Sequence, residues 1–445
     1  MVFREAIERD ALDLLALASR VTAETGHDPF DGTLNRDLTA LGQDYLAQER
    51  RLETAALALR RAWLSAAHRP ADDTLKSPRD GETTHVACGD DLQFGYERDL
   101  DVSILEARGA AYAPPPDGWT GDMVIFRSGQ AALATLLQFV AATWGDKRVL
   151  SVAHAGAYFE TTALLDAWPR RTFRATPASV VSADVVVAEP VWCDGCFGAP
   201  QHLPRARHIL LVDTTMVGPS HDLRPSLAAA ADTCEVAVAF SSGLKLDQGG
   251  LELANVGIVR VLVRNGTRRR TADIARHLKQ LRSLMATGLT LDELSALSAP
   301  WFLDRAYVDN YASAIFGNNR ALARSIGGDS AVFGPHCHPS GSASAADAPF
   351  CAVQLREPSP SRYRRLVEIV ERQSERRGLL LTKGGSFGFR GHRFELIEPA
   401  PGQGHPFLRI AIGWRGGHSC HGLGELFGEL ASHDSFESLD RAYGR

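Results

Sequence analysis

The pattern of apolar and polar positions changes character along the chain. Near the N-terminus, apolar side chains recur at helical spacing over residues 3–24 and again over residues 35–67, which predicts two amphipathic helices. Residues 68–90 are polar and contain proline and glycine, as linkers do. We therefore expect residues 1–90 to form an N-terminal helical arm and linker, with the helices serving as an interface or a lid.

From about residue 120, short apolar segments alternate with helical ones. Strands are predicted over residues 149–153, 185–188, 208–212, 236–240 and 256–263. This alternation is typical of a largely parallel sheet with helices on both faces. The sequence therefore predicts an α/β protein whose large domain covers residues 91–290.

The last third of the chain has a different order of elements. The predicted elements are a helical zone over 292–325, a strand at 350–355, a helix at 361–377, strands at 378–381 and 408–412, and a helix at 422–431. We expect them to form a C-terminal α+β domain over residues 291–445.

Composition and charge restrict the class of protein. With 445 residues, of which 44% are hydrophobic and 23% charged, the chain can bury a large globular core. The net charge of -5, without a block of five like charges, argues against nucleic acid as a partner. The sequence has neither 18 consecutive apolar residues nor a signal-peptide pattern, so we expect a cytoplasmic protein without a membrane segment.

The seven cysteines do not indicate a disulfide framework, because they are unevenly spaced. Cys193 and Cys196 form a CxxC pair that could bind zinc with histidines elsewhere. Since no second pair lies at zinc-finger spacing, we expect reduced cysteines and no metal.

One lysine lies in an unusual setting. Lys245 is one of only five lysines, and it lies in a loop of small residues between the apolar runs 236–240 and 256–263. Burial lowers the pKa of a lysine, and such an amine is a nucleophile that can form a Schiff base. We therefore take Lys245 as the first candidate for covalent chemistry.

Two other positions could serve the same cofactor. Ser128 and Gly129 lie where a strand runs into a helix, so free N–H groups there could bind a phosphate, although an ordinary helix cap has the same pattern. Asp213 ends the strand at 208–212, at the sheet edge where α/β proteins bind ligands, although it could equally cap a turn. A phosphate site, an acid and a buried lysine are what pyridoxal phosphate (PLP) requires.

Six segments carry short motifs in a recognisable order. They are Tyr96-Glu97-Arg98-Asp99, Ser128-Gly129-Gln130-Ala131-Ala132, Tyr158-Phe159-Glu160-Thr161, Asp213-Thr214-Thr215-Met216-Val217-Gly218-Pro219, Ser242-Gly243-Leu244-Lys245, and Ser386-Phe387-Gly388 with Leu408-Arg409-Ile410-Ala411-Ile412-Gly413. Together they resemble the motifs of the cystathionine γ-synthase-like group of fold-type-I PLP-dependent enzymes, also called the Cys/Met metabolism family. The resemblance spans about residues 95–415.

The resemblance implies the fold-type-I architecture, with PLP as cofactor. It implies that Lys245 forms the Schiff base, that Asp213 pairs with the pyridine nitrogen, and that Tyr158 stacks on the ring and acts as acid or base. The further cofactor contacts that it implies are Ser128, Gly129, Gln130, Thr215 and Ser242.

The resemblance also implies the binding of substrate and of a second subunit. Arg409, with Ser386, would hold the α-carboxylate of an amino-acid substrate. Tyr96 and Arg98 correspond to residues that reach the phosphate of a neighbouring subunit. We therefore expect a homodimer or homotetramer with shared active sites.

The chain departs from the family's pattern at several positions. Gln130 replaces a methionine, and Tyr158-Phe159-Glu160-Thr161 stands for Tyr-Gly-Gly-Thr. The family's Glu-Ser-Pro-x-Asn-Pro corresponds to residues 189–194, so the Asn that contacts the cofactor's phenolic oxygen is missing or replaced by Cys193 or Asp194. Arg415 follows where the family has an acidic pair, which would add a cation near the carboxylate site. These departures suggest a specialised substrate.

The leading hypothesis is γ-replacement or γ-elimination on an activated homoserine-like or methionine-like amino acid, through a vinylglycine-type intermediate. A finer hypothesis takes S-adenosylmethionine as that substrate. The enzyme would then join it by a C–C bond to a second small molecule, such as a nicotinamide nucleotide, in natural-product biosynthesis. The alternatives are a β-lyase or an aminotransferase on the same scaffold, and a non-catalytic PLP-fold sensor. His154 could act as a base, although ordinary hydrogen bonding is favoured for it.

Overall fold

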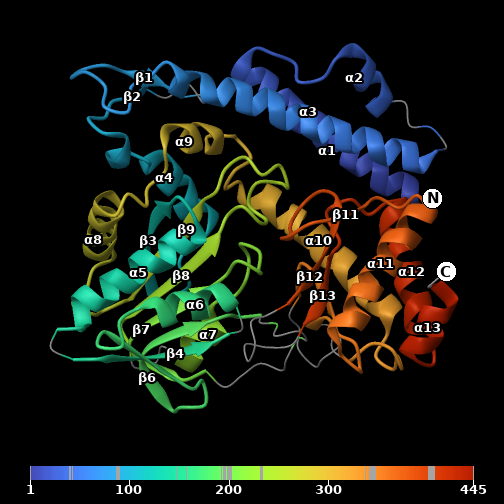
Figure 1. Ribbon diagram of the computed structural model, residues 1–445. Coiled ribbons are helices and arrows are strands. Elements are labelled where there is room, and N and C mark those ends of the chain that lie inside the picture. Colours follow the sequence, from blue (N-terminus) through green and yellow to red (C-terminus); the bar gives the residue numbers. More distant parts are fainter. Residues whose placement is uncertain are drawn as a thin grey trace.

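The computed structural model describes residues 2–39, 42, 44–86, 91–146, 148–156, 158–191, 193, 197, 203–230, 234–335, 337–339, 347–398 and 406–443. Figure 1 shows helices of the N-terminal part lying across both a large α/β region and a smaller C-terminal region. The long helix α10 (Arg305–Ile326) connects these two regions. Of the described helices, none has the length and apolar character needed to cross a membrane.

The N-terminal part is helical, with one difference from the expected pattern. Its elements are α1 (Val2–Thr25), α2 (Gly32–Thr39), α3 (Tyr45–Asp72), β1 (Thr84–His85), β2 (Asp91–Leu92), η1 (Glu97–Asp99) and α4 (Ser103–Tyr112). The single helix predicted over residues 35–67 is in fact two helices. The second helix begins after Asp44, which is its N-cap. The backbone of Asp44 is not helical, and its side chain accepts a hydrogen bond from the N–H of Ala47 at 3.0 Å.

A seven-stranded sheet forms the large region. The elements of this region are β3 (Trp119–Phe126), α5 (Gly129–Trp144), β4 (Leu150–Ala155), α6 (Phe159–Ala167), β5 (Phe173–Thr176), β6 (Ser182–Ala188), β7 (Arg205–Asp213), α7 (Arg224–Ala230), β8 (Val236–Ser242), β9 (Gly257–Arg264), α8 (Thr271–Leu284) and α9 (Leu291–Leu297). The strand order is β3-β9-β8-β7-β6-β4-β5. The strands from β5 to β8 pair in parallel, and β9 runs antiparallel to β8 and β3. The predicted mostly parallel sheet is confirmed.

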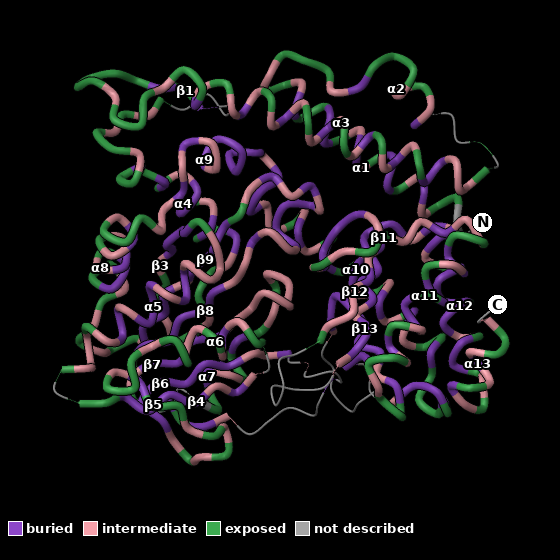
Figure 2. Tube along the Cα trace, in the orientation of Figure 1, coloured by how far each residue is buried: buried purple, intermediate pink, exposed green. Residues whose placement is uncertain are grey.

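Helices cover both faces of this sheet. On one face, Val185 and Leu211 share a hydrophobic cluster with residues of α5 and α8. On the other face, Val186 and Leu210 share a cluster with Leu227 of α7. Successive residues of a strand point to opposite faces, so a sheet buried on both faces needs continuous apolar runs. Figure 2 shows these strands as buried segments between more exposed helices.

The C-terminal region is built on a four-stranded sheet of order β10-β13-β12-β11. Its elements after α10 are β10 (Cys351–Val353), α11 (Pro360–Arg376), β11 (Leu381–Lys383), β12 (His392–Ile397), β13 (Phe407–Ala411), α12 (His418–Ala431) and α13 (Phe436–Tyr443). The helical zone predicted over residues 292–325 is two helices, α9 and α10, because Asp304 caps α10 by accepting from the N–H of Tyr307 at 3.1 Å.

Buried contacts fix the N-terminal helices to both regions. Trp63 of α3 donates from its indole N–H to the carbonyl of Ala296 at 2.7 Å. Glu49, also on α3 and fully buried, accepts from the N–H of Ser419 at 3.0 Å in the first turn of α12, where a carboxylate stabilises the helix dipole. One hydrophobic cluster continues from these helices into the large region, so packing does not separate the two. The domain boundaries predicted at residues 90 and 290 stay a prediction.

Candidate cofactor and active site

The N-terminus of α5 meets the end of β8 at the carboxyl edge of the central sheet. Ser128 caps α5 by accepting from the N–H of Ala131 at 3.0 Å. A Cβ on Gly129 would lie 3.2 Å from the Cβ of Ser242, a tight contact that a larger residue could make only if Ser242 moved slightly. The N–H of Ser242 donates to the hydroxyl of Thr215 at 3.0 Å. Four predicted cofactor contacts therefore lie together, at a helix end that favours an anion.

Asp213 is the last residue of β7, beside this corner. Its Oδ1 accepts from the N–H of Thr215 at 2.9 Å. Burial raises the pKa of Asp213 to about 6, and the Glu189 carboxylate contributes to the rise. A protonated ring nitrogen placed against Asp213 would favour the ionised carboxylate.

Lys245 follows β8 and is half-buried against the C-terminal region. Its ammonium group donates to the hydroxyl of Ser386 and lies 5.7 Å from the ring centroid of Phe387. Burial lowers the pKa of Lys245, and the positive charge of Arg409 lowers it further. Gly388, at φ +86°, packs so closely that a Cβ there would lie 2.0 Å from the carbonyl oxygen of Lys245. The structure therefore brings Lys245 and Ser386 together, as the resemblance implies.

A buried amide that sequence reasoning missed holds the lysine loop. Gln248 donates from Nε2 to the carbonyls of Gly243 at 3.0 Å and Ala254 at 2.6 Å, and its Oε1 accepts from the N–H of Leu253 at 2.6 Å. The side chain is fully buried. A polar residue inside a run of small and apolar residues was the available signal, since a buried amide must have such partners.

Tyr158 precedes α6, and its hydroxyl points at a carboxylate. It donates to Oε2 of Glu160 at 2.5 Å, and the same oxygen accepts from Nε2 of Gln130 at 3.2 Å. Burial and the contact with Glu160 raise the pKa of Tyr158 far above its usual range. The charges of Asp213 and Arg409 also act on the pKa of Tyr158, so both residues lie within electrostatic range of its hydroxyl.

His154 and Glu189 form a second polar pair behind Tyr158. The Nε2 atom of His154 lies 3.0 Å from Oε1 of Glu189, and the hydroxyl of Thr162 lies 3.3 Å from Nδ1. Oε1 of Glu189 also accepts from the N–H of Tyr158 at 3.1 Å. Glu189 therefore supports the tyrosine, a role that sequence reasoning missed because it considered only the absent Asn of this segment.

Arg409 lies on β13, paired across the sheet with Glu395 of β12. One Nη atom contacts the Glu395 carboxylate, while the buried Nε has no hydrogen-bond partner among the described residues. The rings of Phe350 and Phe387 lie 5.6 and 6.0 Å from the guanidinium carbon. A buried donor without an acceptor is costly, and a carboxylate would satisfy it.

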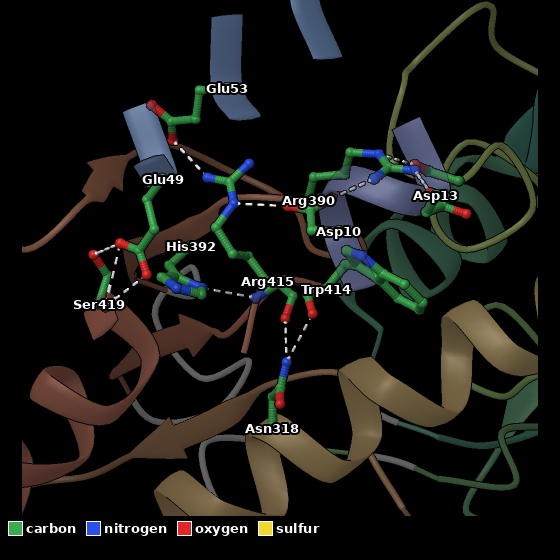
Figure 3. A network of polar contacts seen from close by, with 12 residues as sticks. Asp10, Asp13, Glu49, Glu53, Asn318, Arg390, His392, Trp414, Arg415 and Ser419 are labelled. Atoms are coloured by element: carbon green, nitrogen blue, oxygen red, sulfur yellow. Dashed lines mark hydrogen bonds and ion pairs between the residues drawn. The ribbon is translucent and has the colours of Figure 1, made fainter. Parts of the chain in front are cut away.

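Arg415 does not lie at the carboxylate site, so that expectation is corrected. Its side chain is 2% exposed and donates from Nε to Asp10 of α1 at 2.9 Å, and a second nitrogen lies 3.5 Å from Glu53 of α3. Figure 3 shows the guanidinium directed at these helices. The chain leaves the sheet after Ala411, so Arg415 points elsewhere than Arg409.

Tyr96 and Arg98 lie at the surface, away from this corner. Tyr96 is 58% exposed, and the guanidinium carbon of Arg98 lies 5.2 Å from its ring centroid. Arg98 also lines an open hollow of about 780 Å³ between η1 and α8. Their predicted contact with a neighbouring subunit stays a prediction.

Part of the segment expected to contact the phenolic oxygen is not placed. Trp192, Asp194 and Cys196 lie outside the described residues, so what replaces the family's Asn stays open. Among the described residues, the structure has no cluster of three or more His, Cys, Asp or Glu side chains suited to a metal.

In the central sheet, Asp213 is the last residue of β7 and Lys245 follows β8. No family model and no curated protein sequence matches the chain. Solved structures do match: cystathione gamma lyase (CalE6) from Micromonospora echinospora is 18% identical, with a TM-score of 0.51 over 86% of this chain and 99% of that one.

Two further structures show the same likeness. For metB from Corynebacterium glutamicum the identity is 15% and the TM-score 0.51, over 86% of this chain and 97% of that chain. For cystathionine gamma-lyase from yeast the identity is 14% and the TM-score 0.51, over 85% and 98%. At these identities the likeness establishes the fold, and the predicted fold class is confirmed.

Proposed function

We propose that this protein is a PLP-dependent enzyme that eliminates or replaces the γ-substituent of an amino acid. The observation that carries the proposal is the position of Lys245, half-buried at the carboxyl edge of the sheet with a lowered pKa and in contact with Ser386. The charges of Arg409 and Asp213 both act on the pKa of Tyr158, so these predicted site residues lie within electrostatic range of one another. A non-catalytic sensor needs no such lysine.

The residues present fit the three parts of the cofactor. The N-terminus of α5, with Ser128 and Gly129, suits the phosphate, and Lys245 suits the aldehyde. Asp213 suits the ring nitrogen, because its raised pKa falls when a cation pairs with it. When bound, PLP withdraws electrons from the substrate's Cα and makes its proton removable.

The remaining work belongs to side chains of this chain. Arg409 would bind the α-carboxylate through its buried Nε, near the rings of Phe350 and Phe387. Lys245 would take a proton from the substrate on Nζ and return it at another carbon. The neutral amine is the form that can take this proton, and both burial and the charge of Arg409 lower the pKa of Lys245, which favours that form.

The finer proposal is that the substrate is an activated homoserine-like or methionine-like amino acid, with S-adenosylmethionine as the specific candidate. Glu160 and Glu395 place carboxylates beside Tyr158 and Arg409. A carboxylate near the leaving group favours a positively charged sulfonium over a neutral thioether. A second small molecule, such as a nicotinamide nucleotide, would then accept the carbon chain by a C–C bond in natural-product biosynthesis, in keeping with the departures from the family's motifs.

We expect the purified protein, reconstituted with PLP, to be yellow and to change its visible spectrum when S-adenosylmethionine is added. The measurement is the absorption spectrum together with the amounts of methylthioadenosine, ammonia and keto acid released. O-acylhomoserine is the matched neutral substrate and should react more slowly. Transfer of the amino group without release of ammonia would instead indicate an aminotransferase, and loss of a β-substituent would indicate a β-lyase.

We also propose a dimer or tetramer with shared active sites, working in the cytoplasm. The exposed Tyr96–Arg98 segment supports the shared site, and the absence of a disulfide between the five described cysteines fits a reducing compartment. Arg98→Ala and Lys245→Ala should each be inactive alone. Co-expressed in equal amounts, they should recover about a quarter of the wild-type activity, because half the dimers carry one intact site of two. No recovery in mixed dimers would exclude shared sites.

A further inference from the structure

A second feature of the site is a three-residue contact centred on Glu160. Its Oε2 accepts from the hydroxyl of Tyr158 at 2.5 Å and from the amide of Gln130 at 3.2 Å. Gln130 lies in the first turn of α5 and Glu160 in the first turn of α6, so the contact joins the two helices. Gln130 and Glu160 are also two of the positions at which the chain departs from the family's motifs, and they contact each other.

The contact fixes the direction of the tyrosine proton. Because Glu160 accepts it, the lone pairs of the Tyr158 oxygen point away from Glu160. The pKa of Tyr158 is raised by burial and by the same carboxylate, so the side chain stays a neutral phenol around neutral pH. A neutral phenol cannot by itself accept a proton from substrate, unless its own proton leaves at the same time.

We propose that Glu160, acting through Tyr158, accepts the proton that an incoming amino-acid substrate must lose from its ammonium group. The N–H bond breaks and an O–H bond forms on Tyr158, while the tyrosine's own proton moves to Oε2 of Glu160. The lone pair stays on the substrate nitrogen, no electron is transferred, and the reverse movement returns the proton. Glu160 is thus a positioning and proton-accepting partner, and Gln130 holds its carboxylate in place. The inference rests on the proposed function.

Other charged groups face this pair and would contribute to its pH dependence. Glu189 accepts from the N–H of Tyr158, the charges of Asp213 and Arg409 act on the pKa of Tyr158, and Glu160 itself acts on the pKa of Lys245. His154 faces the pair through Glu189. An effect of Glu160 must therefore be separated from theirs by a readout specific to Tyr158.

The test uses Glu160→Gln in the PLP-loaded enzyme, with Glu160→Asp as the conservative variant and Gln130→Met as a milder one. Glu160→Gln should lower kcat/KM by about 10²–10⁴-fold, and Glu160→Asp should restore part of this loss. Removing the carboxylate should also lower the pKa of Tyr158. That shift is read as ultraviolet absorbance of the tyrosinate, with Tyr158→Phe as the background.

The outcomes separate this inference from the proposed function. An unchanged kcat/KM in Glu160→Gln, with the visible band and turnover intact, would overturn the proton-accepting role and leave the enzyme assignment standing. A slower variant in which Tyr158 ionises as in the wild type would overturn it too. A wild type that binds no PLP would instead end the proposed function, while the tyrosine titration would still report the Tyr158–Glu160 contact. Since the pair acts as one unit, Tyr158→Phe with Glu160→Gln should cost no more than Tyr158→Phe alone.

Discussion

Lys245→Ala should lose at least about 10³-fold in turnover and should lack the visible band of the covalently bound cofactor. Lys245 supplies both the amine that bonds to the cofactor and the group that moves the substrate proton, so no neighbouring side chain replaces it. The nearest polar partner is the hydroxyl of Ser386, which is neither a base nor an amine. The measurement is the visible spectrum beside the rate of product release under saturating substrate.

Lys383→Ala is the matched control for this loss. Lys383 lies on β11, and its ammonium group pairs with Glu371 at 3.1 Å. Its side chain is 59% exposed, so it is not a buried nucleophile. The control should keep both the band and the rate, since exposed ion pairs contribute little. Turnover retained in Lys245→Ala would exclude a catalytic role for Lys245 and would contradict the proposed chemistry.

Asp10→Asn should lower the free energy of unfolding by about 3–5 kcal/mol, because it leaves buried guanidinium groups without their shared carboxylate. Oδ1 of Asp10 accepts from Arg390 at 2.7 Å and Oδ2 accepts from Arg415 at 2.9 Å, and all three side chains are buried (Figure 3). Asp13 and Glu53 still contact the arginines, which favours the lower end of the range. The measurement is the urea midpoint at constant pH.

Glu5→Gln, on the same helix, is the control for Asp10→Asn. Glu5 is exposed, and its replacement should change stability by less than about 0.5 kcal/mol. Asp10→Asn should also slow turnover, because Arg390 donates from Nε to the carbonyl of Gly249 at 3.1 Å, in the loop that carries Lys245. Equal midpoints for the two variants would show that the buried pairs do not stabilise the fold.

The central strands could be predicted from the sequence because burial on both faces leaves a continuous apolar run, as in β7, where Leu210 and Leu211 belong to clusters on opposite faces. The strand β12 could not be predicted, because His392, Arg393 and Glu395 are polar. This segment is a strand because it pairs with β11 and β13. The break before α3 depended on one capping side chain, Asp44, which an apolar periodicity does not register.

The candidate site follows the same division. Lys245 and Asp213 stand next to buried strands, so their position in the sheet could be read from local sequence. Arg415 was misplaced because its partner Asp10 is 405 residues away in the chain. The roles of Glu160 and Gln248 could not be predicted, because they depend on contacts that exist only after the chain has folded.

The contact of Asp10 with Arg390 has a consequence for how the protein is made. The two residues are 380 positions apart, and at about 5–20 residues per second the ribosome needs roughly 20–80 s to reach the second after the first. During that time the carboxylate of Asp10 lacks its arginine partners, whereas the apolar face of α1 can already pack against α3. The hydrogen bond from Arg390 to the carbonyl of Gly249, in the loop that carries Lys245, can therefore form only late in synthesis.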